Sequence, residues 1–233
     1  MSDNPLSSIS PVPQSQTMRI ECFAATRPQQ GRSQNEDAFL IGRGERPFVA
    51  LCDGAGNAER AAKRVLALFE KLFGEATAAQ TVDPATWNKW VKLLDSSLLG
   101  SAQSTFIGLV ESNGGVVGAC TGDSRAYLIN REGQCRILTD GALKHRLGSG
   151  HAEAFPIRSA LSPRDILLLL SDGAWTPLSP YLLQKAVASA ATRHFSELPG
   201  AILDAASRAG RADDMTAVTL RLRSITGAYS SES

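Results

Sequence analysis

An apolar run that leads into an acidic residue beside a glycine occurs three times in this chain, and no other feature constrains the fold as strongly. Residues 48–52 lead into Asp53-Gly54, residues 116–120 into Gly122-Asp123, and residues 166–170 into Asp172-Gly173. Short apolar runs of this kind suit strands that are buried on both faces. A single Asp-Gly pair would be interpreted as a turn, but the repetition predicts carboxylates gathered at the ends of several strands.

Two further acidic clusters, Glu36-Asp37 and Asp213-Asp214, lie beside segments with strand character. Carboxylates gathered at strand ends repel one another unless a cation pairs with them. No lysine lies within four positions of Asp53, Asp172 or Asp213. Magnesium and manganese bind carboxylate, carbonyl and water oxygens. The sequence therefore predicts a divalent-metal site at these strand ends.

Length and composition favour one globular domain. With 233 residues, of which 43% are hydrophobic, the chain can build one large core. The net charge of +1 and the lack of a basic stripe argue against nucleic acid and anionic membranes as partners. Four cysteines without CxxC spacing indicate reduced core thiols. The apolar runs are too short to span a bilayer, and the N-terminus lacks a signal-peptide pattern. We expect a cytoplasmic monomer.

The order of elements along the chain predicts an α+β fold. We expect polar tails at 1–17 and 224–233, one domain at 18–223, and a loop region at about 140–164, where His145 and His151 would be solvated. Helices are expected at 58–73, ending near Gly74, from Asp83-Pro84 onward, at 180–192 and at 196–209. Strands are expected at 18–25, 38–41, 48–52, 105–110, 116–120, 126–129, 135–138, 165–170 and 215–222. Hairpins in the middle and helices in two separated pairs favour a sheet sandwich flanked by helices.

Several familiar motifs are missing, and one remains as an alternative. The chain has no phosphate-binding G-x-x-x-x-G-K-[ST] loop and no G-x-S-x-G elbow. Gly122-Asp123-Ser124 resembles the nucleophile block of GDSL-type esterases, but the C-terminal Asp-x-x-His of that family is missing. A cluster of carboxylates can instead hold two bridged cations for the hydrolysis of phosphate esters. Arg32 adds a guanidinium suited to phosphate oxygens, although a lone arginine more often forms a surface salt bridge.

The order of the acidic blocks resembles the metal-dependent serine/threonine protein phosphatases of the PPM, or type 2C, family. The resemblance covers roughly residues 18–223. It is carried by five blocks in the family's own order: Arg32-Ser33-Gln34-Asn35-Glu36-Asp37, Asp53-Gly54-Ala55-Gly56, Gly122-Asp123-Ser124-Arg125, Ser171-Asp172-Gly173 and Asp213-Asp214-Met215-Thr216. It implies a four-layer α/β/β/α sandwich and a binuclear Mn²⁺ or Mg²⁺ site. It also implies a phosphorylated protein substrate, made by a cognate Ser/Thr kinase.

The resemblance also implies a role for each site residue. Asp53 would bridge the two metals, Gly54 would offer its carbonyl, and Glu36 would bind one metal while Asp172 and Asp213 bind the other. Asp37 would orient the attacking water and Arg32 would hold the substrate phosphate. Asp123 would bind the third metal seen in bacterial members, or else cap the turn that follows it.

The chain departs from the family pattern in three ways. Asn57 and Ala58 stand where the family has Gly and His, so a proposed general acid is missing. Asp214 stands where the family has Asn, which we expect to add negative charge near the metals. The segment 140–163 is shorter than the flap of many bacterial relatives. A pseudophosphatase that only binds phosphoproteins is therefore a second alternative, although a binding module has no need of the whole ligand set.

Overall fold

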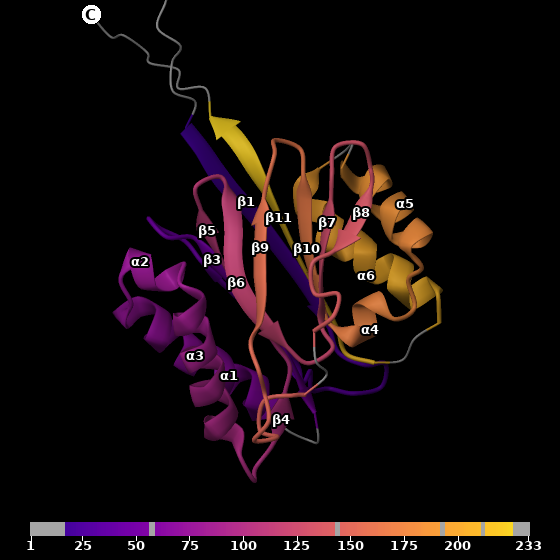
Figure 1. The fold of residues 1–233 in the computed structure, drawn as a ribbon. Coiled ribbons are helices and arrows are strands. Elements are labelled where there is room, and N and C mark those ends of the chain that lie inside the picture. The colour runs from indigo at the N-terminus through magenta and orange to yellow at the C-terminus, as the bar shows by residue number, and fades with distance from the viewer. Residues whose placement is uncertain (1–16, 56–58, 143–144, 192–193, 211–212, 226–233) are drawn as a thin grey trace, which may run out of the picture.

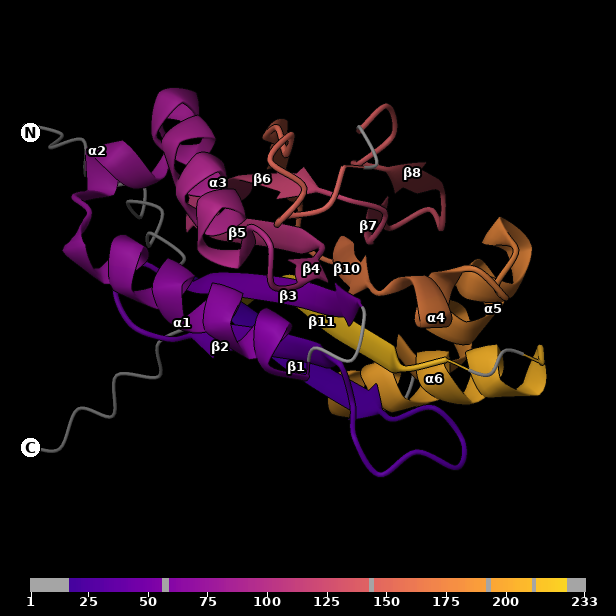
Figure 2. The same cartoon turned by 90° about the horizontal axis from the view of Figure 1, so that it is seen from below.

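Two antiparallel sheets pack face to face, and helices cover the outer face of each (Figure 1). The structure is a computed structural model that describes residues 17–55, 59–142, 145–191, 194–210 and 213–225. Figure 2 shows α1 and α3 on one side of the molecule and α4, α5 and α6 on the other. The expected four-layer α/β/β/α sandwich is confirmed.

The first sheet has five strands in the order β1-β11-β10-β7-β8. Their bounds are Thr17–Arg27 (β1), Met215–Ile225 (β11), Ile166–Leu170 (β10), Arg125–Ile129 (β7) and Cys135–Ile137 (β8). The two ends of the described chain, β1 and β11, pair along their whole length.

The second sheet has the order β2-β3-β5-β6-β9, and a short strand β4 also pairs with β3. The bounds are Asp37–Gly42 (β2), Phe48–Ala55 (β3), Gln103–Ser104 (β4), Phe106–Ser112 (β5), Gly115–Thr121 (β6) and Phe155–Ala160 (β9).

The helices form two groups, one for each sheet. The helices of the first half of the chain are α1 (Glu59–Glu75), α2 (Ala78–Thr81) and α3 (Pro84–Leu98), and those of the second half are α4 (Asp172–Trp175), α5 (Pro180–Ala191), the 3₁₀ turn η1 (Phe195–Glu197) and α6 (Leu198–Arg208). The predicted start of α3 is confirmed, because the Asp83 carboxylate accepts a hydrogen bond from the Ala85 backbone N–H. None of the described helices is long and apolar enough to cross a membrane.

The unbroken apolar runs are explained by burial on both faces of each sheet. In β3, Val49 and Leu51 point into the layer between the sheets, whereas Ala50 and Cys52 pack under α1 and α3. Side chains of a strand alternate between its faces, so a strand covered on both sides must be apolar at every position. The same alternation continues to Asp53, which therefore faces the space between the sheets at its end.

Some expected boundaries were wrong. The region 140–164, which we expected to be a loop, contains β9, and this strand pairs with β6. Residues 155–160 form a strand despite Pro156, and their side chains largely alternate between buried and exposed. Helix α1 continues through Gly74 to Glu75. The short helix α2 was not expected, and a capping box at Thr77 caps its N-terminus. Strand β1 runs from Thr17 to Arg27 and β11 ends at Ile225, so both strands are slightly longer than the expected 18–25 and 215–222. The rest of the expected tails lies outside the described residues.

Candidate metal centre

Asp37 and Asp53 lie opposite each other on neighbouring antiparallel strands. Asp37 opens β2, and its Cα pairs in register with that of Asp53 in β3. Strand β3 continues past Asp53 to Ala55, so this carboxylate is fixed within a strand and not on the loop after it. The Asp53 backbone is also bonded to Thr105, whose Oγ1 accepts from the Asp53 N–H at 2.9 Å and whose N–H donates to the Asp53 carbonyl at 2.8 Å. The two carboxylates are therefore held close together by rigid backbone.

Both carboxylates are buried, and three of their oxygens are orphaned. Among the described residues, Oδ1 and Oδ2 of Asp37 and Oδ2 of Asp53 make no hydrogen bond. Burial raises the pKa of Asp37 to about 7, and the nearby Asp214 and Asp172 add to the rise. Burial and the neighbouring Asp37 raise the pKa of Asp53 to about 8. Buried carboxylates without hydrogen-bond donors are costly unless a cation neutralises them.

Asp172 and Asp213 are brought together by the packing of α4 against the start of β11. The Ser171 hydroxyl accepts a hydrogen bond from the Thr216 N–H at 2.9 Å, and the Ser171 N–H donates to the Thr216 carbonyl at 3.1 Å. A Cβ at Gly173 would lie only 2.0 Å from the Asp214 carbonyl oxygen. This glycine is therefore needed for close approach of two backbones, and not for a turn with positive φ.

Glu36, Gly54 and Arg32 lie beside the two central carboxylates. The Gly54 N–H donates to the Glu36 carbonyl at 3.1 Å, which fixes Glu36 next to the end of β3. The Arg32 side chain is about half exposed, and its Nη1 lies 3.7 Å from the Glu36 carboxylate. Arg32 therefore forms an ion pair, as its more ordinary interpretation predicted, and its partner Glu36 is a largely covered residue of the predicted site.

Asp214 has a structural role that the sequence did not predict. Its Oδ1 accepts a hydrogen bond from the Gln29 N–H and its Oδ2 accepts one from the Glu36 N–H, both at 2.6 Å. An asparagine has only one carbonyl oxygen to offer, so the carboxylate is what allows both contacts. The charge of Asp214 does act on the site, since it helps to raise the pKa of Asp37. Its two oxygens, however, anchor the loop between β1 and β2 that carries Arg32.

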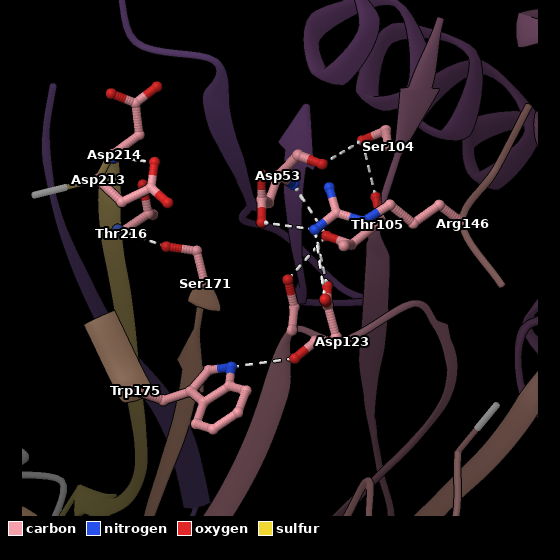
Figure 3. Close-up of polar contacts among 11 residues, drawn as sticks. Asp53, Ser104, Thr105, Asp123, Arg146, Ser171, Trp175, Asp213, Asp214 and Thr216 are labelled. Atoms are coloured by element: carbon pink, nitrogen blue, oxygen red, sulfur yellow. Dashed lines mark hydrogen bonds and ion pairs between the residues drawn. The ribbon is translucent and has the colours of Figure 1, made fainter. Parts of the chain in front are cut away.

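Arg146 is the residue that sequence reasoning missed. Its Nη2 lies 3.0 Å from Oδ1 and 3.3 Å from Oδ2 of Asp123, and 3.7 Å from Oδ2 of Asp53. Figure 3 shows the guanidinium between these two carboxylates. Arg146 lies in the segment that we expected to be a loop without pattern, about 90 positions after Asp53 in the printed sequence. No local signal in the sequence links the two.

The geometry around Ser124 is unfavourable for the esterase alternative. The Ser124 side chain is buried, and its hydroxyl forms a 2.7 Å hydrogen bond with the Thr105 hydroxyl. A nucleophilic serine needs an exposed hydroxyl and a base within hydrogen-bond reach. Gly122 and Asp123 instead turn the chain between β6 and β7, with Gly122 at a φ of +91° against Thr105. His145 and His151 are exposed, as expected.

The donor set fits a pair of hard divalent cations. Asp53, Asp172, Asp213 and Glu36 supply carboxylates and Gly54 a carbonyl, the ligand chemistry that Mn²⁺ and Mg²⁺ prefer. Both Asp37 oxygens and Asp53 Oδ2 make no hydrogen bond to the described residues, and Asp53 Oδ2 has only the ion pair with Arg146 at 3.7 Å there. In the described part of the chain, no three acidic, imidazole or thiol groups lie close enough together to hold a metal ion. The fit of these residues to divalent cations therefore rests on the buried oxygens of Asp37 and Asp53 that make no hydrogen bond to the described residues. The departures at Asn57 and Ala58 lie outside the described residues.

Solved structures that resemble this chain include several serine/threonine phosphatases. The catalytic domain of PstP in complex with two manganese ions matches with a TM-score of 0.73 and 22% identity, over 88% of this chain and 99% of that one. The S. agalactiae serine/threonine phosphatase matches with a TM-score of 0.76 and 15% identity, over 87% and 99%. The PPM Ser-Thr phosphatase MsPP from Mycobacterium smegmatis, in complex with cacodylate, matches with a TM-score of 0.69 and 22% identity, over 86% and 97%.

No family model matches the sequence. No curated protein matches it either. At identities of 15–22% the structural likeness establishes the architecture and not the chemistry. The assignment of the fold rests on TM-scores of 0.69–0.76 that extend over nearly the whole length of each neighbour. The chain has the fold of the bacterial PPM-type, or type 2C, serine/threonine protein phosphatases.

Proposed function

We propose that the protein hydrolyses phosphoserine and phosphothreonine on proteins at a binuclear Mn²⁺ or Mg²⁺ site. The observation that carries the proposal is the pair formed by Asp37 and Asp53. These two buried carboxylates face each other across β2 and β3, with three oxygens that make no hydrogen bond to the described residues. Such an arrangement destabilises a protein that binds no cation there.

The metal pair, when bound, supplies positive charge that activates water and neutralises phosphoryl oxygens. Asp53 would bridge the pair, Glu36 and the Gly54 carbonyl would bind on one side, and Asp172 and Asp213 on the other. Asp37 would orient the attacking water through its carboxylate. Arg32, half exposed beside Glu36, binds the substrate phosphate through its planar fork.

The proposed setting is that of a monomeric cytoplasmic enzyme acting on the products of a Ser/Thr kinase. The four cysteines are free in the structure, which supports a reducing compartment. Among the residues of the site, Arg32 is exposed and the rest are largely covered, a geometry suited to a phosphate that arrives on a protein side chain.

The test is hydrolysis of a phosphoserine peptide and of nitrophenyl phosphate, with Mn²⁺ and with chelator. We expect activity only with the metal. We expect Asp53→Asn to lower kcat by at least about 10²-fold, on the scale of losing one preorganised charge in the transition state. Asp165→Asn is the matched control, because Asp165 is equally buried and its carboxylate accepts from the Ser162 N–H of the local turn, away from the site.

Three results would separate the alternatives. Equal hydrolysis with and without chelator would contradict the metal site. Cleavage of carboxylic esters insensitive to chelator would point to an esterase. Phosphopeptide binding without turnover, at saturating Mn²⁺ and with intact fold, would point to a pseudophosphatase.

A further inference from the structure

We infer that the guanidinium of Arg146 takes the place of a third cation at Asp123, so that the protein binds two divalent metals and not three. The inference rests on the proposed function, because it concerns how the same site is charged. It assigns to Asp123 an arginine partner in place of a metal ion.

The contacts of Arg146 are those of a cation held among carboxylates. One nitrogen, Nη2, touches both oxygens of Asp123, at 3.0 and 3.3 Å, and lies 3.7 Å from Asp53. The Arg146 side chain is 19% exposed and that of Asp53 is 11% exposed. A guanidinium keeps its charge at every pH that a protein tolerates. Asp123 is thus already neutralised by a permanent charge of the chain.

The backbone around Arg146 is anchored on both sides. The Thr121 hydroxyl donates to the His145 carbonyl at 2.6 Å, and Leu147 exchanges two backbone hydrogen bonds with Ser104, at 2.8 and 3.1 Å. Leu147 is fully buried, and the Gly148 N–H donates to the Asp95 carboxylate at 2.6 Å. The guanidinium is therefore delivered to the site by a fixed segment and not by a free surface loop.

Asp123 is fixed as firmly as its partner. The Trp175 indole N–H donates to the Asp123 carbonyl at 3.0 Å (Figure 3), and the Arg125 guanidinium stacks 3.5 Å over the Trp175 ring. Both carboxylate oxygens of Asp123 face Nη2. A divalent cation bound to this carboxylate would meet the guanidinium at contact distance, and like charges at such a distance repel strongly. The arginine and a third metal therefore exclude each other.

The test counts bound Mn²⁺ by isothermal titration calorimetry and by equilibrium dialysis. We expect about two ions per chain in the wild type, as in other two-metal sites, and about one more in Arg146→Met, which removes the charge and keeps an apolar side chain of similar length. The double variant Arg146→Met with Asp123→Asn should return to the wild-type number. Arg146→Lys, which keeps a positive charge, should not gain an ion.

Asp123→Asn in the wild-type background provides a second test, which does not depend on how well Arg146→Met folds. Because Asp123 binds the guanidinium and not a metal, this variant should keep the wild-type number of ions. The matched control is Arg221→Met, which removes another partly buried arginine paired with a carboxylate, Glu21 at 2.7 Å, outside the site. It should leave the count unchanged.

The outcomes distinguish this inference from the proposed function. A wild type that binds no Mn²⁺ overturns the metal site and the inference together. If the wild type binds two ions and Arg146→Met binds the same number or fewer, only the role of Arg146 is overturned. A wild type that binds three ions and loses one in Asp123→Asn also overturns that role and leaves the phosphatase proposal intact.

Discussion

At the scale of single residues, the structure shows that Asp214 anchors the loop between β1 and β2. Its two oxygens accept the Gln29 and Glu36 N–H groups, both at 2.6 Å, and its side chain is buried. In Asp214→Asn the amide group would turn a donor toward one of these donors. We expect the variant to lose about 1–3 kcal/mol of unfolding free energy and to raise KM for phosphopeptide, because the loop that carries Arg32 is released. Urea unfolding and steady-state kinetics measure both effects.

Asp204→Asn is the matched control for this prediction. Asp204 pairs with Arg27 at 2.8 Å, but both side chains are about half exposed, and exposed pairs contribute only about 0–1 kcal/mol. Its substitution should change neither stability nor KM appreciably. An Asp214→Asn variant that behaves like Asp204→Asn would show that the loop does not depend on these two hydrogen bonds.

At the scale of elements, the site depends on how closely α4 approaches the start of β11. A Cβ at Gly173 would lie 2.0 Å from the Asp214 carbonyl oxygen and 3.1 Å from Asp213 Cβ. Gly173→Ala must therefore push α4 away from β11 and separate Asp172 from Asp213. We expect a loss of about 1–3 kcal/mol in stability, the usual cost of overpacking, and a loss of about 10–100-fold in Mn²⁺ affinity, as for other supports of metal ligands. Calorimetry and urea unfolding are the measurements.

Gly200→Ala in α6 is the corresponding control. No atom lies within 4 Å of a Cβ at this position, so the substitution meets no obstacle. Alanine in place of glycine in a helix is neutral or stabilises by up to about 1 kcal/mol. If Gly173→Ala proved as harmless as Gly200→Ala, the close approach of α4 and β11 would not be what positions Asp172 and Asp213.

At the scale of the whole molecule, the buried carboxylates couple folding stability to pH. The folded-state pKa of Asp37 is raised to about 7 and that of Asp53 to about 8, from 3.8. The folded state therefore holds its protons more tightly than the unfolded chain. This contribution to stability is present at about pH 4 and is lost as the pH rises through about 7 to 8. With chelator, we expect the urea midpoint to fall between about pH 5 and pH 8.5.

Mn²⁺ should oppose this fall, since metals bind the deprotonated carboxylates. The gain in urea midpoint on adding Mn²⁺ should therefore increase with pH over the same range. Asp53→Asn, which removes one of the two shifted groups, should flatten the curve recorded with chelator. A metal-free midpoint that stays level or rises with pH would contradict the raised pKa values of these buried carboxylates.

Much of the site was predictable because it follows from local patterns. The apolar runs before Asp53 and Asp172 mark strands covered on both faces, and the period of two places Asp53 on the inner face. The place of Asp37 near the site could be predicted from its position at the start of a strand. The turn at Gly122-Asp123 and the cap at Asp83 also follow from residue chemistry alone. Strand β9 was missed because it contains Pro156, and a proline argues against a strand assignment.

The sequence by itself determined the kinds of strand and the acidic residues at their ends, and hence the prediction of a hard-cation site. These depend on neighbours along the chain. The tertiary structure alone decided that Asp53 pairs with Asp37, that Asp214 binds the Gln29 and Glu36 N–H groups, and that Arg146 reaches Asp123. Contacts of this second kind join residues far apart in sequence, and only the packing of the two sheets brings them within reach of one another.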